Sequence, residues 1–69
     1  MFREVVVIYS SNLRAERSRL GLSREALSEK SNVSVTTIQN IETGKTKSPT
    51  LQTMKKLAKS LNVNLNEII

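Results

Sequence analysis

The chain has 69 residues, enough for one domain with a small core and near the lower limit for folding without disulfides or metals. It contains no Cys and no His, which excludes disulfides, thiolate metal sites and imidazole chemistry. Eleven Lys and Arg against six Asp and Glu give a net charge of +5, which favours a polyanionic partner such as nucleic acid but also fits acidic proteins or anionic membranes.

The residue inventory is unsuited to catalysis. There is no His or Cys for proton transfer or nucleophilic attack, no glycine-rich phosphate loop, and no pair of acids at a spacing that would place both in a pocket. We therefore expect no enzyme, no cofactor and no metal site. The longest apolar run, residues 5–9, is too short to span a membrane and follows an acidic residue, unlike a signal peptide, so a cytoplasmic protein is expected.

Residues 1–10 form the first segment, which we expect to be an arm preceding a domain over residues 11–69. The β-branched run favours an extended strand, although its spacing with Leu13 and Arg17 also fits one face of a lengthened first helix. A lone strand would pair with the same strand of a second subunit, because its backbone groups are otherwise unpaired. The alternative is an arm that covers part of this subunit's own core.

A cluster of cap residues at positions 10–12 precedes a predicted helix that ends at about Leu20, because Gly21 follows. Leu13 and Leu20 are expected to face inward. Arg17 lies between them on a face that should be largely buried, where a guanidinium requires a carboxylate partner. The alternative for this arginine is a solvated charge.

Residues 22–44 predict two short helices joined by a tight turn. Ser23 is a suitable N-cap for the first, and Asn32 readily adopts the left-handed backbone that a sharp turn between helices requires. Ser34 then caps the second helix, and Gly44 ends it. In the first helix the apolar face comprises Leu22, Ala26 and Leu27.

The second of these helices has two distinct faces. Val35, Ile38 and Ile41 recur at the spacing of an inward-facing stripe. The opposite face is polar but uncharged, and it consists of Thr36, Gln39, Asn40 and Thr43.

A polar loop, KTKSP, follows Gly44, and Thr50 caps a further predicted helix. Its apolar stripe is expected to be core, and it consists of Leu51, Met54, Leu57, Ala58 and Leu61. Its solvated face carries Lys55, Lys56 and Lys59. Asn64 and Glu67 then form a capping box for a short last helix with apolar residues that need cover, namely Leu65, Ile68 and Ile69.

The stretch LSREALSEKSNVSVTTIQNIETGKTKSP, with Arg17 upstream, resembles the helix-turn-helix domain of the lambdoid phage repressor and Cro family, also called the xenobiotic-response-element family. The resemblance covers about residues 13–68, and its most specific parts are the ALSEKSNVS turn and the IETGKTKSP exit. It implies an all-α fold, a compact five-helix bundle of the phage repressor type that contains the helix-turn-helix. The chain departs from the family in having Arg24 for Gln, Ser28 for Ala and Asn32 for Gly.

The resemblance assigns two sets of structural and base contacts. In the family, an Arg at the position of Arg17 pairs with a Glu at the end of the recognition helix, which here is Glu42, and the pair fixes how that helix is presented. The main base-reading positions correspond to Val35, Thr36 and Asn40, with Gln39 as an auxiliary one. Val and Thr suit thymine methyls, while Gln and Asn each grip adenine with a donor and an acceptor. Because no Lys or Arg lies on this helix, we expect reading chiefly at A·T pairs.

The phosphate contacts are expected at both ends of the motif, supported by backbone N–H groups at helix N-termini. Our candidates are Arg24, Ser34, Thr43, Lys45, Thr46 and Lys47. The alternative for the charged members of this set is a solvated surface. At Arg24 a neutral contact of the family is exchanged for a charged one.

The resemblance implies a sequence-specific regulator of transcription that binds double-stranded DNA, and we expect a repressor. It would act as a homodimer on an inverted repeat with half-sites roughly 34 Å apart, the helix over residues 34–43 lying in the major groove. The dimer would form through the arm, the last helix (Leu65, Ile68, Ile69), or both. Packing of the last helix onto its own subunit is the competing use.

Two other functions remain as alternatives. One is an antitoxin-type protein-interaction module that binds a toxin and also regulates its own operon with the same DNA-binding core. The other is RNA binding, which usually depends on exposed aromatic side chains. Only Phe2 and Tyr9 are aromatic, and both lie in the apolar arm, so the sequence disfavours RNA.

Overall fold

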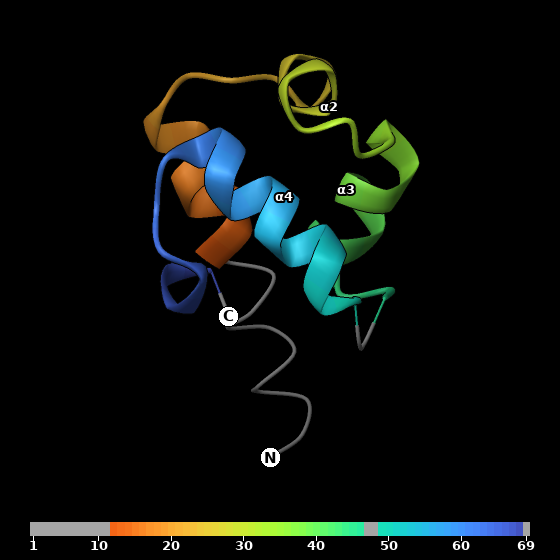
Figure 1. Ribbon diagram of the computed structural model, residues 1–69. Helices are drawn as coiled ribbons and strands as arrows, with labels where there is room; N and C mark the ends of the chain where they lie inside the picture. The colour runs from red at the N-terminus through yellow and green to blue at the C-terminus, as the bar shows by residue number, and fades with distance from the viewer. Residues whose placement is uncertain (1–11, 47–48, 69) are drawn as a thin grey trace.

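The computed structural model describes residues 12–46 and 49–68. The expected arm of residues 1–10 lies outside this range, as do Lys47 and Ile69. Within it no strand occurs, and none of the helices is long and apolar enough to cross a membrane. The described residues form a first helix over residues 12–19, then α2 (Arg24–Ser31), α3 (Val35–Glu42), α4 (Leu51–Leu61) and the 3₁₀ turn η1 (Leu65–Glu67) (Figure 1).

The first helix ends at a glycine in the left-handed conformation. Gly21 has a φ of +67°, and the N–H groups of Gly21 and Leu22 donate to the carbonyl oxygens of Ser18 and Arg17 at 2.9 and 3.1 Å. Such a turn brings the residue after the glycine back onto the core, and Leu22 packs there. Leu20 is 41% exposed instead, which corrects the expectation that it faces inward. The prediction assumed that Leu20 continues the helix, but the helix ends at residue 19, so helical spacing does not decide where the Leu20 side chain points.

The caps predicted for α2 are present. The Ser23 hydroxyl accepts a hydrogen bond from the backbone N–H of Ala26 at 3.0 Å. At the other end Asn32 has a φ of +63°, and its N–H donates to the carbonyl oxygen of Ser28 at 2.9 Å. The left-handed turn between α2 and α3 therefore falls where the sequence indicates, with Asn in the role that Gly commonly takes.

α3 follows directly and has the same kind of boundaries. The Ser34 hydroxyl accepts from the N–H of Thr37 at 3.1 Å. Beyond the last residue of the helix, Gly44 has a φ of +77° and donates its N–H to the carbonyl oxygen of Ile41 at 3.1 Å. α2 and α3 therefore form the predicted pair of helices joined by a tight turn.

α4 begins after Thr50, whose hydroxyl accepts from the N–H of Thr53 at 3.1 Å. Most of the predicted stripe is buried, but Leu51 is 59% exposed, which corrects its assignment to the core. Leu51 is the first residue of the helix and lies beyond the part that the bundle covers. The helix ends at Asn62, a second left-handed asparagine with a φ of +57°.

The short last helix is a single 3₁₀ turn, η1. The backbone N–H of Asn64 donates to the Glu67 carboxylate at 3.3 Å, one of the contacts that a capping box predicts. Ile68 is fully buried in its own subunit, while Leu65 packs partly buried against the core. This burial corrects the assignment of Ile68 to a dimer interface, because the side chain has no surface to present to a second subunit.

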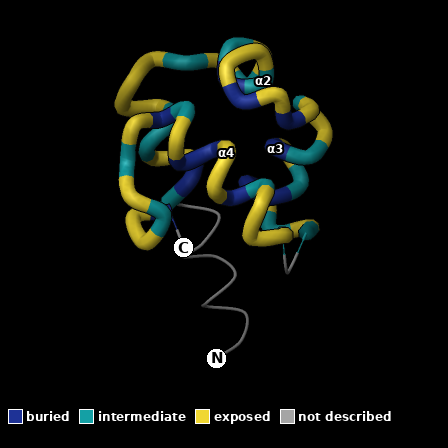
Figure 2. Tube along the Cα trace, viewed as in Figure 1, coloured by how far each residue is buried: buried dark blue, intermediate teal, exposed yellow. Residues whose placement is uncertain are grey.

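One hydrophobic core unites these elements, and the buried stretches face the centre of the bundle (Figure 2). α2 packs against both α3 and α4. The outer side of α3 is left uncovered. The core consists of Leu13, Leu27, Val33, Ile38, Ile41, Met54, Leu57, Ala58, Leu61 and Ile68.

Candidate nucleic-acid interface

α3 presents one polar face to solvent and buries the other. Ile38 and Ile41 have no exposed surface and fix the inner side of the helix in the core. On the outer side, Thr36 and Gln39 are exposed, and Asn40 is half-buried. The structure therefore brings the predicted base-reading side chains together on one open surface, whose remaining member, Val35, is half-buried at the start of the helix.

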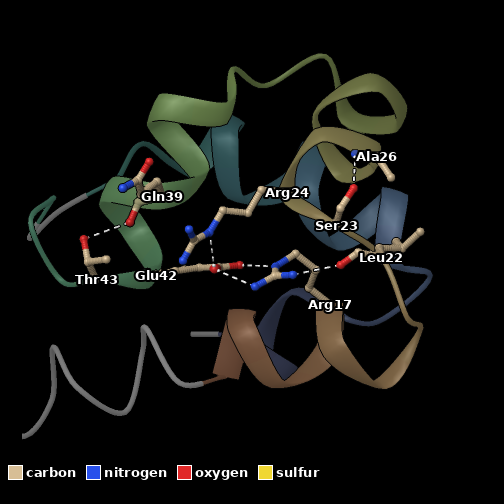
Figure 3. Close-up of polar contacts among 8 residues, drawn as sticks. All are labelled: Arg17, Leu22, Ser23, Arg24, Ala26, Gln39, Glu42 and Thr43. Carbon is tan, nitrogen blue, oxygen red and sulfur yellow. Dashed lines mark hydrogen bonds and ion pairs between the residues drawn. The ribbon is translucent and has the colours of Figure 1, made fainter.

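The C-terminal end of α3 is held by a carboxylate that two arginines share (Figure 3). Arg17 Nε donates to Glu42 Oε2 at 2.6 Å, and its Nη2 donates to Oε1 at 3.0 Å. Arg24 Nε donates to the same Oε1 at 3.0 Å. The Glu42 side chain is fully buried, the Arg17 side chain is 14% exposed and that of Arg24 is 33% exposed.

This arrangement controls the charge of the carboxyl group. Burial alone raises the pKa of Glu42, but the hydrogen bonds and positive charges of Arg17 and Arg24 outweigh it, so the pKa lies below its usual value. The hydrogen bond to Glu42 in turn raises the pKa of Arg17, against the smaller effect of burial. Glu42 is therefore ionised and paired, as a buried charge must be.

Arg17 also connects the first helix to the entry of α2. Its Nη1 donates to the carbonyl oxygen of Leu22 at 2.8 Å, next to the cap residue Ser23. A single guanidinium thus holds the C-terminal end of α3 and the chain before α2 in one orientation.

The contact between Arg24 and Glu42 is one that sequence reasoning missed. The sequence predicts Arg24 as a phosphate ligand because it lies at the start of α2, and no spacing rule relates it to a residue at the end of α3. The contact uses the Nε–H, one of the five N–H donors of a guanidinium. Its place at the N-terminus of α2 and its partial exposure keep Arg24 near the surface.

Two predicted phosphate ligands use their hydroxyl protons within the chain. The Ser34 hydroxyl donates to Thr37 Oγ1 at 2.8 Å. The Thr43 hydroxyl donates to the backbone carbonyl oxygen of Gln39 at 2.8 Å (Figure 3). Each hydroxyl would have to rotate before it could donate to a phosphate oxygen.

The loop after α3 folds back onto the helix. The N–H of Thr46 donates to the carbonyl oxygen of Asn40 at 3.0 Å, so Thr46 lies close to the C-terminal end of α3. Lys45 is exposed just before it. Lys47, the remaining candidate of this loop, lies outside the described residues.

These features define a helix-turn-helix: a capped α2, a left-handed turn, and an α3 with a buried stripe on one side and an exposed polar face on the other. The family model described as Helix-turn-helix (HTH_3) matches residues 13–68, and the chain belongs to this family, of the phage repressor and Cro type. The resemblance inferred from the sequence is confirmed. The chain is a DNA-binding regulator of transcription.

One solved structure similar to this chain is the crystal structure of the restriction-modification controller protein C.AhdI from Aeromonas hydrophila. The two chains superpose with a TM-score of 0.89 at 27% sequence identity, over 96% of this chain and 98% of the other. The comparison with curated proteins gives no match.

Proposed function

We propose that this protein is a transcriptional repressor that binds an inverted-repeat operator as a homodimer, with α3 in the major groove. The observation that carries the proposal is the exposed, uncharged polar face of α3 on a helix whose end is held by the Glu42 carboxylate. A helix offered to base edges must keep its orientation, because a direct contact discriminates between bases only when donor and acceptor meet in the correct geometry.

We propose that Thr36, Gln39 and Asn40 read base edges, with Val35 against thymine methyls. Amide side chains pair with adenine, a hydroxyl group can hydrogen-bond to a base donor or acceptor, and a methyl group can contact the thymine methyl. α3 carries no Lys or Arg, which are the usual partners of guanine. The half-site is therefore expected to be recognised mainly at A·T pairs.

Phosphate binding is proposed for Arg24 at one end of the motif and for the loop of Lys45, Thr46 and Lys47 at the other. Glu42 holds Arg24 near the start of α2, so the guanidinium loses less freedom when it meets a phosphate. Ser34 and Thr43 rank below these residues as phosphate donors, because their hydroxyl protons already have acceptors within the chain.

A homodimer is proposed because one such helix reads only a few base pairs, and two helices on half-sites roughly 34 Å apart supply useful specificity. The proposed contacts are the arm of residues 1–10 and, in the C-terminal segment, the half-buried Leu65 together with Ile69. Repression follows if the bound dimer covers DNA that the transcription machinery needs. The similarity to a restriction-modification controller protein favours this regulator over an antitoxin, and it suggests neighbouring restriction and modification genes as the regulated ones.

Selection from random duplex DNA with the purified protein tests the proposal. The expected product is a two-fold symmetric site with A·T-rich half-sites one helical turn apart. Light scattering on the same sample, with and without the selected duplex, should give the mass of a dimer on DNA. Selection of an asymmetric site, or a monomer at tens of micromolar both with and without DNA, would contradict the dimer.

A further inference from the structure

A cationic hollow lies between α2 and α4, apart from the residues assigned to DNA. It has a volume of about 450 Å³ and is open to solvent. One wall is the last turn of α2 with the residue that follows it, and the other is one face of α4. We call it the lysine pocket, and it is lined by Lys30, Ser31, Asn32, Lys56, Lys59 and Ser60.

The backbone around the lysine pocket is firmly held. Ser31 is buried, and its hydroxyl accepts a hydrogen bond from the N–H of Val33 at 3.2 Å. On the other wall the Ser60 hydroxyl donates to the carbonyl oxygen of Lys56 at 2.9 Å. The hollow is therefore a feature of two packed helices, while its three lysine side chains are exposed and able to move.

None of the described residues neutralises the positive charge of the pocket. None of its three ammonium groups forms an ion pair with another residue that the structure describes. Lys30 and Lys59 lie in the last turns of their helices, where a cation interacts favourably with the helix dipole. Lys56 lies in the middle of α4, where the dipole gives it no such role, and yet it faces the same hollow.

The pocket faces away from the proposed DNA contacts. Arg24 lies at the N-terminus of α2, whereas Lys30 is six residues further on, roughly 9 Å along the helix axis. In Figure 1, α4 lies in front, with α2 above it; in Figure 3, α4 lies behind, and Arg24 and Glu42 are on the near side. A protein bound to DNA through α3 would leave this surface accessible.

We propose that the lysine pocket is a docking site for an acidic segment of a partner protein. Charge complementarity favours such a partner, and because the hollow is open to solvent, a segment of another chain can reach its lysines. Lys56 and Lys59 are three residues apart on α4, so their side chains lie side by side, and they match two carboxylates presented at the same spacing. The pocket lacks aromatic side chains and Arg, the groups that usually stack on bases or grip phosphates in a fork.

A labelled peptide of ten glutamates, measured by fluorescence anisotropy with the whole chain, tests the docking site. Lys56→Glu and Lys59→Glu should each weaken its binding at least tenfold. Lys55→Glu is the matched control, because Lys55 is an exposed neighbour on α4 that does not line the pocket. It should change binding less than threefold. If either charge-reversal variant fails to fold, the neutral variants Lys56→Gln and Lys55→Gln provide the same comparison.

Amide NMR spectra of the wild-type chain with the same peptide should show shifts concentrated at Lys30, Asn32 and Ser60. Equal losses for the Lys55 and Lys56 variants, or shifts spread evenly over all lysines, would overturn the proposal. So would a loss of affinity for the selected operator in Lys56→Glu as large as in Lys45→Glu, since the pocket would then be a phosphate site. Binding to the operator is tested separately, with the Lys45 and α3 variants. Failure of the docking proposal therefore leaves the proposed function standing, and failure of the proposed function shows in those variants.

Discussion

Arg24 Nε donates to Glu42 Oε1 at 3.0 Å, so the first residue of α2 is bonded to the last residue of α3. The same oxygen accepts from Arg17, and the three residues link the first helix, α2 and α3 through one buried carboxylate. The two arginines and the one glutamate carry a net charge of +1. The partly exposed Arg24 therefore keeps positive charge near the surface, beside the other proposed DNA contacts. The following predictions begin with this carboxylate.

Glu42→Gln should lower the free energy of unfolding by about 3 kcal/mol, because it leaves the largely buried Arg17 without a charged partner. Urea denaturation followed by circular dichroism measures this change. Glu29→Gln is the control, since Glu29 is exposed, and it should change the free energy by less than about 0.5 kcal/mol. Equal midpoints for the two variants would show that the Glu42 cluster does not stabilise the fold.

The same carboxyl group predicts an acid-dependent loss of stability. Because the pKa of Glu42 is lower in the folded than in the unfolded chain, its contribution is complete above the unfolded value, about 4.3, and is lost as the pH falls through the folded value. The difference in melting temperature between the wild type and Glu42→Gln should be constant from pH 7 to about pH 5 and should shrink below that. A difference that grows at low pH would contradict the assigned direction of the shift.

Thr36→Ala and Asn40→Ala should each weaken binding to the selected operator by about 10- to 100-fold, the range expected for loss of a direct base contact. Binding to random duplex DNA should change little, because phosphate contacts dominate it. Electrophoretic mobility shifts with both duplexes measure the ratio. Gln52→Ala, an exposed change on α4, is the control. Parallel losses on both duplexes would remove these residues from sequence recognition.

Arg24→Gln and Lys45→Gln should each reduce the slope of log affinity against log salt concentration by about one, with sequence preference intact. Fluorescence anisotropy from low to physiological salt gives the slope. Lys55→Gln lowers the net charge equally but lies outside the proposed interface, so its slope should match the wild type. If all three variants shift the slope alike, overall charge and not local phosphate contact accounts for the effect.

Asn32→Gly should raise the free energy of unfolding by about 0.5 to 1 kcal/mol, and Asn32→Ala should lower it by about 1 kcal/mol, because residue 32 has a φ of +63°. Thermal denaturation of both variants gives the comparison. An alanine variant as stable as the glycine variant would show that the turn relaxes out of the left-handed conformation.

Helix boundaries were the part of the fold most accessible from sequence, because they depend on residues with local preferences. Ser23, Ser34 and Thr50 each accept a backbone hydrogen bond where a cap was expected, and Asn32 turns the chain as expected. These contacts span only three or four residues, so the local sequence contains most of the information that decides them.

Relations between distant elements were less accessible. Helical spacing predicts an inward direction for Leu20 and Leu51 but does not decide whether the helix continues that far or whether a neighbouring helix reaches the side chain, and both are exposed. The hydrogen bond from Arg24 to Glu42 and the convergence of Lys30 with Lys56 depend on how α2 crosses α3 and α4. That crossing is set by packing of the whole core, which no single stretch of sequence encodes.

The two sides of α3 separate attachment to the bundle from the proposed recognition of DNA. Ile38, Ile41 and Glu42 are buried and attach the helix to the bundle. The side chains of Thr36 and Gln39 are exposed and do not contribute to this attachment. Exchanging the outward side chains alone should therefore change which DNA sequence is selected and leave the buried framework that holds them intact.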